Sequence, residues 1–114
     1  DRLCINKNIF LLEPIAYHEM LRLNMDATIM LTDSGGLQEE CCVLGTPCLT
    51  LRWNTERPVT LLDNGGSAIL VGNDVGLIKK GFNEMLSMTI NPNKPELWDG
   101  HTAERCLKAI LNHR

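Results

Sequence analysis

A short apolar run, a serine-glycine-glycine turn and a helical pattern follow one another at positions 28–44, and they constrain the fold more than any other part of the chain. The run at 28–32 is typical of a buried parallel strand. Residues 36–44 are typical of a helix that packs back on the sheet. Gly-Thr-Pro at 45–47 ends this helix, with a glycine just past the last turn and a proline behind it. The sequence therefore predicts a strand-to-helix turn at Ser34.

This turn has the composition of an anion-binding site. Gly35 and Gly36 allow the backbone to approach a ligand without a Cβ in the way. The free N–H groups and the positive dipole end of the helix favour an anion there, and Ser34 supplies a hydroxyl. Glu39 and Glu40 follow within the first turns, where one of them can accept hydrogen bonds from sugar hydroxyls. The segment predicts half of a nucleotide-sugar site.

The alternative is a purely structural turn. Ser34 is also a good N-cap residue, and acidic residues near a helix start are favoured by the dipole alone. A single glycine-rich turn is weak evidence for a ligand. Taken by itself, the turn leaves both interpretations open.

The rest of the chain alternates between strand and helix patterns. Buried strands are predicted at 8–12, 28–32, 48–51 and 67–71. Three further helices are predicted. The first has Tyr17, Met20, Leu21 and Asn24 on one face, and the second is capped by Asp74 and has Val75, Ile78, Phe82, Met85 and Leu86 on one face. The third follows a linker at 91–95 and carries Ala103, Cys106, Leu107, Ile110 and Leu111, and a brief helical turn is predicted at 59–62. This alternation predicts an α/β fold, a Rossmann-like parallel sheet of about four strands with flanking helices, in a single partial domain over 1–114.

Composition narrows the class of partner. The formal net charge is −3, and no basic patch with interleaved aromatics occurs, which argues against nucleic acid. No apolar run approaches the length of a membrane span, and no signal-peptide pattern opens the chain. The cysteines are odd in number, form no CxxC motif and have no histidine at metal-ligand spacing. They are predicted to be small buried residues in a reducing, cytoplasmic compartment: Cys4, Cys41, Cys42, Cys48 and Cys106.

Five motifs occur in the same order as in a known enzyme family. They are LEPIAY at 12–17, LTDSGGLQEE at 31–40, LGTP at 44–47, NTERP at 54–58 and WDGHTAER at 98–105. In these motifs the chain resembles the UDP-N-acetylglucosamine 2-epimerases. The resemblance implies part of the C-terminal domain of a GT-B-like fold, in which two Rossmann-like domains face each other across a cleft that holds UDP-GlcNAc. It also implies that the N-terminal domain, with the acidic catalytic residues, and a diphosphate-gripping histidine lie outside this chain.

The same resemblance assigns roles to residues of the turn. It implies that Ser34, Gly35 and Gly36 hold the diphosphate. Glu40 would accept hydrogen bonds from the ribose hydroxyls. Gln38 or Glu39 would support the turn.

Roles are also implied outside the turn. Arg57 would contact the phosphates or order its loop through Glu56, although these two residues can equally form an ion pair within the loop that has no ligand role. Met20 matches a position that packs on uracil in some relatives, and core packing is its alternative. Val59 stands where the family often has an acid, so the role of that carboxylate is not implied here.

The activity implied is that of an isomerase, non-hydrolysing rather than hydrolysing. UDP would be eliminated from UDP-GlcNAc and added back with inversion at C2 of the sugar to give UDP-ManNAc, in cell-surface polysaccharide biosynthesis. The resemblance implies no cofactor, no metal and no catalytic residue within this chain, which would then be inactive alone. The partners implied are UDP or UDP-GlcNAc and the N-terminal domain. A second copy of the chain is also expected as a partner, because a parallel sheet without its leading strands exposes an apolar face and an unpaired edge. The alternatives are a GT-B glycosyltransferase domain and a non-catalytic nucleotide-sugar binding module.

Overall fold

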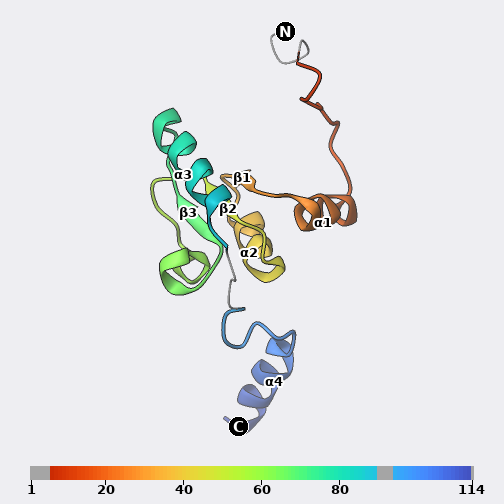
Figure 1. Ribbon diagram of the computed structural model, residues 1–114. Coiled ribbons are helices and arrows are strands. Elements are labelled where there is room, and N and C mark those ends of the chain that lie inside the picture. The colour runs from red at the N-terminus through yellow and green to blue at the C-terminus, as the bar shows by residue number, and fades with distance from the viewer. Residues whose placement is uncertain (1–5, 90–93, 114) are drawn as a thin grey trace.

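The computed structural model describes residues 6–89 and 94–113, and these contain a parallel three-stranded sheet with helices around it (Figure 1). The strands are β1 (Met30–Thr32), β2 (Cys48–Thr50) and β3 (Ala68–Leu70), in the spatial order β1-β2-β3. Met30 pairs with Cys48, and Cys48 pairs with Ala68. The predicted α/β fold with a parallel sheet is confirmed.

The helices begin and end close to the predicted positions. They are α1 (Tyr17–Asp26), α2 (Gly35–Leu44), α3 (Val75–Ser87) and α4 (Thr102–Asn112), with short 3-10 turns η2 (Pro58–Thr60) and η3 (Leu62–Asn64). Asp74 caps α3 by accepting a hydrogen bond from the Leu77 N–H at 2.8 Å. Gly45 ends α2 with a φ of 80°, a left-handed conformation that glycine adopts without strain.

The core lies on both faces of β2. Cys48 packs with Cys41 of α2, whereas the next residue, Leu49, packs with Met85 of α3. Successive side chains of a strand point to opposite faces, so α2 and α3 cover opposite sides of the sheet. Gly81 allows α3 to come close, because a Cβ there would lie 2.9 Å from side-chain atoms of Ile69 and Val71.

The predicted strand at 8–12 is wrong. These residues are exposed and not in a strand, and the sheet has three strands rather than about four. The Phe10 side chain is 81% exposed. An apolar run becomes a strand only beside another strand. Here α1 packs against α2, and the segment before α1 runs away from the β1 edge (Figure 1).

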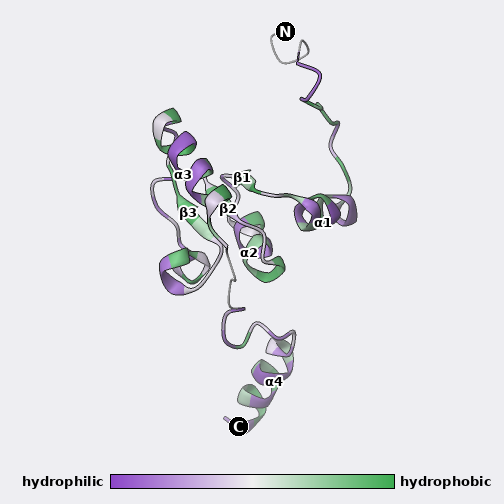
Figure 2. Ribbon diagram, viewed as in Figure 1, coloured by the Kyte–Doolittle hydropathy of each residue, from purple (hydrophilic) through white to green (hydrophobic). Residues whose placement is uncertain are grey.

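Helix α4 forms as predicted, but its apolar face is uncovered. The linker before it falls partly at 91–93, outside the described residues. In Figure 1 α4 lies apart from the sheet, and Figure 2 shows apolar and polar residues along it. Leu107 and Ile110 are 58% and 63% exposed.

The predicted apolar face of α3 is only partly buried. Met85 is buried, whereas the other residues of this face are half-buried or exposed.

The cysteine prediction holds for three positions and fails at one. Cys41, Cys42 and Cys48 are buried and free, and burial raises the pKa of Cys42. Cys106 is exposed on α4, as are the apolar residues Leu107, Ile110 and Leu111 of the same helix. Cys4 lies outside the described residues. No helix within 6–89 and 94–113 is long and apolar enough to cross a membrane, and those residues hold no cluster of metal-binding side chains.

Candidate functional site

Ser34 lies between the carboxyl end of β1 and the start of α2. Its Oγ accepts a hydrogen bond from the Leu37 N–H at 3.4 Å, so it is the N-cap of α2. Its own N–H donates to the Thr32 Oγ1 at 3.1 Å. Ser34 therefore has the N-cap geometry that the structural alternative predicted. This role is compatible with ligand binding, because the N–H groups of Gly35 and Gly36 lie in the first turn, where they have no partner within the helix.

The Arg57 guanidinium covers the backbone of Gly35. A Cβ on Gly35 would overlap the Arg57 Nη1 and lie 2.5 Å from its Cζ, so only glycine leaves room for this side chain. Gly36 is open by comparison, since a Cβ there would meet only the Ser34 Oγ at 3.8 Å. The two glycines therefore have different surroundings. Gly35 allows the Arg57 guanidinium to lie at the positive end of α2, a position that the helix dipole alone would disfavour for a cation.

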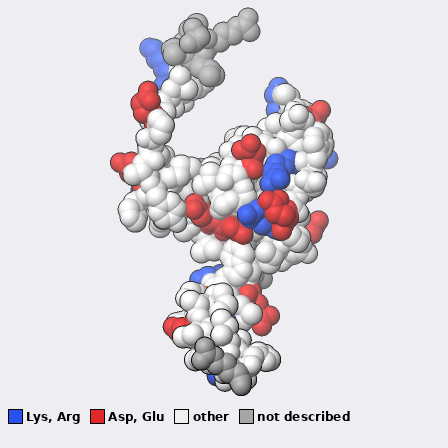
Figure 3. All heavy atoms as spheres, turned by 180° about the vertical axis from the view of Figure 1, so that it is seen from behind, with Lys and Arg blue, Asp and Glu red and all other residues white. Residues whose placement is uncertain are grey.

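Acidic neighbours offset this repulsion. The Arg57 Nε lies 3.0 Å from the Glu39 Oε1 as an ion pair, although the two atoms lack hydrogen-bond alignment. The Arg57 Nη1 pairs with Glu56, whose carboxylate raises the pKa of Arg57. A hydrogen bond from its own backbone N–H and then the Arg57 guanidinium lower the pKa of Glu56. Arg52 reaches the second Glu56 oxygen at 3.1 Å. The predicted loop ion pair is present, in a molecule where acidic and basic side chains meet on one face (Figure 3).

Gln38 is fully buried and faces the loop. Its Nε2 donates to the Thr60 Oγ1 at 2.6 Å, and its Oε1 accepts from the Thr55 Oγ1 at 3.1 Å. Both ends of the amide are used within the protein. Gln38 therefore joins α2 to the loop that carries Arg57.

A pocket of about 360 Å³ opens between α1 and α2. Its lining residues are Tyr17, Leu21, Gly36, Glu39, Glu40, Val43 and Leu44. The Glu40 Oε2 is buried, and no donor among the residues described in the structure reaches it. A buried acceptor without a donor is costly, so this carboxylate is suited to a ligand that brings hydroxyl groups.

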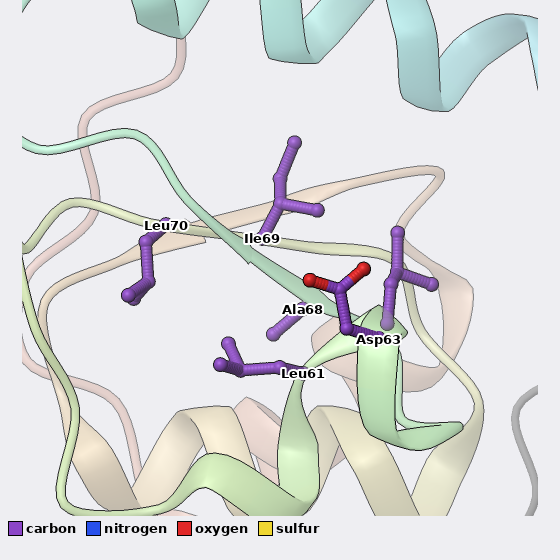
Figure 4. A pocket seen from close by; sticks show the side chains of 6 residues that line it. Leu61, Asp63, Ala68, Ile69 and Leu70 are labelled. Atoms are coloured by element: carbon purple, nitrogen blue, oxygen red, sulfur yellow. The ribbon is translucent and has the colours of Figure 1, made fainter.

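Another pocket, of about 280 Å³, lies beside β3 and η3. Figure 4 shows Leu61, Asp63, Ala68, Ile69 and Leu70 around it. None of the residues predicted for the nucleotide site lines this pocket, and its lining is aliphatic apart from Asp63. It does not belong to the candidate site.

The structure thus brings together most of the predicted residues at one end of α2. Met20 does not line the pocket, whereas Tyr17 and Leu21 of the same helix do. Tyr17 and Met20 were both predicted on one helical face, and the family resemblance singled out Met20 rather than Tyr17. Thr55 and Thr60 were missed, and the signal that could have found them is the pair of polar β-branched residues on either side of Arg57.

The chain is similar in sequence to known proteins. The sequence pattern of the family described as UDP-N-acetylglucosamine 2-epimerase matches residues 2–111. A relative of that name from Methanocaldococcus jannaschii is 43% identical over 110 residues, which are 96% of this chain and 29% of the relative. One from Escherichia coli K12 is 37% identical over an alignment of 115 positions, which covers 95% of this chain and 30% of the relative.

Solved structures show the same likeness. The M. jannaschii UDP-GlcNAc 2-epimerase in complex with UDP-GlcNAc and UDP has a TM-score of 0.84 and 41% identity, over 97% of this chain and 30% of that one. The Neisseria meningitidis UDP-GlcNAc 2-epimerase bound to UDP-GlcNAc has a TM-score of 0.77 and 31% identity, over 96% of this chain and 31% of that one. The chain spans about three tenths of the length of the relatives that it matches.

Proposed function

Because the chain belongs to the UDP-N-acetylglucosamine 2-epimerase family, we propose that it is the UDP-binding part of an isomerase that interconverts UDP-GlcNAc and UDP-ManNAc. The observation that carries the proposal is the Arg57 guanidinium lying on the Gly35 backbone at the start of α2. The solved M. jannaschii relative, in complex with UDP-GlcNAc and UDP, supports the choice of ligand.

In this proposal the two ends of UDP meet different parts of the site. The first N–H groups of α2 and the Arg57 guanidinium bind the diphosphate, because both present positive charge to an anion. The unsatisfied Glu40 oxygen accepts hydrogen bonds from the ribose hydroxyls. Glu39 holds the Arg57 side chain through its ion pair. The side of the pocket at Tyr17 then remains for the uracil ring of UDP.

The proposed reaction is elimination of UDP from C1 together with the proton on C2. UDP then adds back at C1, and a proton adds to the opposite face of C2, which inverts that carbon. Negative charge builds on the β-phosphate as UDP leaves, and a fixed guanidinium beside it lowers the barrier. Removal of the sugar proton needs a positioned base. Glu39 is paired with Arg57 and Glu40 serves the nucleotide, so we place the base outside this chain and propose that the chain alone does not turn over. A non-hydrolysing, cytoplasmic parent enzyme completes the proposal.

A titration of the chain with UDP, followed by amide NMR, tests the binding role. We expect shifts at 34–40 and 54–57, with a dissociation constant on the order of 1 mM. Arg57→Gln should weaken binding about tenfold or more, because a hydrogen bond to a charged group is lost. Arg22→Gln is the matched control, since it makes the same change of charge in an exposed ion pair on α1. Equal affinities for UDP and uridine would contradict a diphosphate site.

A further inference from the structure

We propose that Gln38 is a positioning residue that fixes the backbone of Arg57 through two threonine hydroxyls. The proposal rests on the proposed function, because it concerns how the diphosphate-binding arginine is held. Gln38 and Thr60 are both fully buried. Neither side chain has a surface to offer a ligand, so their contribution is to the geometry of the loop.

Four hydrogen bonds form a closed ring. The Arg57 N–H donates to the Thr55 Oγ1 at 3.1 Å, and the Thr55 hydroxyl donates to the Gln38 Oε1 at 3.1 Å. The Gln38 Nε2 donates to the Thr60 Oγ1 at 2.6 Å, and the Thr60 hydroxyl donates to the Arg57 carbonyl oxygen at 2.8 Å. Both backbone polar groups of Arg57 are therefore connected, each through one hydroxyl, to the same side-chain amide.

The donors and acceptors of this ring suit an amide side chain at its centre. The Thr55 oxygen accepts from Arg57, so its proton must go to an acceptor. The Thr60 proton goes to the Arg57 carbonyl, so that oxygen must receive a donor. A side chain with one acceptor and one donor bonded to the same carbon completes both bonds, and an amide has this arrangement. A glutamate carboxylate would offer two acceptors and leave the Thr60 oxygen without a donor.

The ring explains how a half-exposed arginine keeps one position. The Arg57 and Glu56 side chains are 28% and 59% exposed, and ion pairs at such exposure contribute little in water. Buried hydrogen bonds are screened far less. The ring therefore fixes the peptide of Arg57, and the ion pairs with Glu39 and Glu56 select among the directions that its side chain can take. A guanidinium that is already in place does not have to be ordered when a phosphate binds.

Two substitutions break the ring at different points. Thr55→Val removes the hydroxyl that accepts a hydrogen bond from the Arg57 N–H. Gln38→Met removes the side-chain amide at the centre of the ring with little change in volume. Thr55→Ser keeps the hydroxyl and is the matched control. In each protein we would measure hydrogen exchange of the Arg57 amide without ligand, relative to that of Cys48, which donates to Ser67 at 2.9 Å in the sheet. The same proteins would then be titrated with UDP.

We expect relative exchange at Arg57 to rise about fivefold in Thr55→Val, the factor for one hydrogen bond of ordinary strength, and to stay at the wild-type value in Thr55→Ser. UDP affinity should fall with it. Because Thr55 is only half-buried, its variant carries the test if Gln38→Met does not fold.

Unchanged exchange at Arg57 in Thr55→Val would overturn the ring, whatever UDP does. Faster exchange with unchanged UDP affinity would reduce Gln38 to a structural residue and overturn its positioning role. If the wild type itself binds no UDP while the exchange result is as expected, the ring stands as a structure and the proposed function fails.

Discussion

At the scale of single residues, the contact between Gly35 and Arg57 links the helix start to the loop. Position 35 requires glycine because the Arg57 guanidinium lies where a Cβ would be, not because the backbone has an unusual φ. The atoms in the way belong to the far end of a flexible side chain. A larger residue at this position should therefore move the arginine rather than unfold the chain.

Gly35→Ala should displace the Arg57 guanidinium and leave the fold intact. The NMR signal of the Arg57 Nε–H should shift, because the side chain loses its place beside Glu39 at 3.0 Å. UDP affinity should fall about tenfold, as for the loss of one hydrogen bond to a charged group. Gly36→Ala is the structural control, since its Cβ would meet no atom closer than 3.8 Å and should leave that signal unchanged. An unshifted Arg57 signal in Gly35→Ala would disprove the contact.

At the scale of elements, the sequence pattern predicted the features that depend on interactions between residues close in sequence. The strand-to-helix turn at Ser34 and the cap at Asp74 were predicted because each depends on residues adjacent in sequence. The run at 8–12 has the composition of a strand, but a strand also needs a neighbour, and its pattern carries no information about one. The ring around Gln38 was not predicted for the same reason, because it joins residues 17 and 22 positions apart.

Helix α4 allows a prediction about pH, because an ion pair between Arg105 and Asp99 lies at its start. Arg105 donates to both Asp99 oxygens at 2.9 Å and to the Leu97 carbonyl at 2.7 Å. The Arg105 guanidinium lowers the pKa of Asp99 from its ordinary value of 3.8 to about 2. A depressed carboxyl pKa stabilises the folded form above pH 3.8, and this contribution is lost as the pH falls through about 2.

The α4 backbone chemical shifts should therefore move toward coil values over that interval of pH in the wild type. In Asp99→Asn they should be closer to coil at neutral pH and should lack this transition. The variant keeps every other titrating group of the segment, so the difference between the two curves isolates Asp99. Identical curves for both proteins would show that Asp99 does not hold the start of α4.

At the scale of the whole molecule, the described residues leave apolar surface exposed at several places. They include the segment at 9–12, where Phe10 and Leu12 are 81% and 64% exposed, and the apolar face of α4. Within 6–89 and 94–113, β1 pairs only with β2, so its outer edge offers free backbone groups. The molecule is elongated, with extents of 63 × 31 × 24 Å. An unpaired edge beside exposed apolar residues favours association.

We expect the chain to self-associate through the 9–12 segment and the β1 edge at concentrations of tens of micromolar, a range typical of weak interfaces. Light scattering should give a mass that rises with concentration. Phe10→Ser should lower this mass toward that of the monomer, because the most exposed side chain of the segment no longer has apolar area to bury. Leu107→Ser makes a comparable change on α4 and should leave the mass unchanged. If Leu107→Ser alone gives the monomer, α4 is the interface; a wild-type monomer at these concentrations would contradict association altogether.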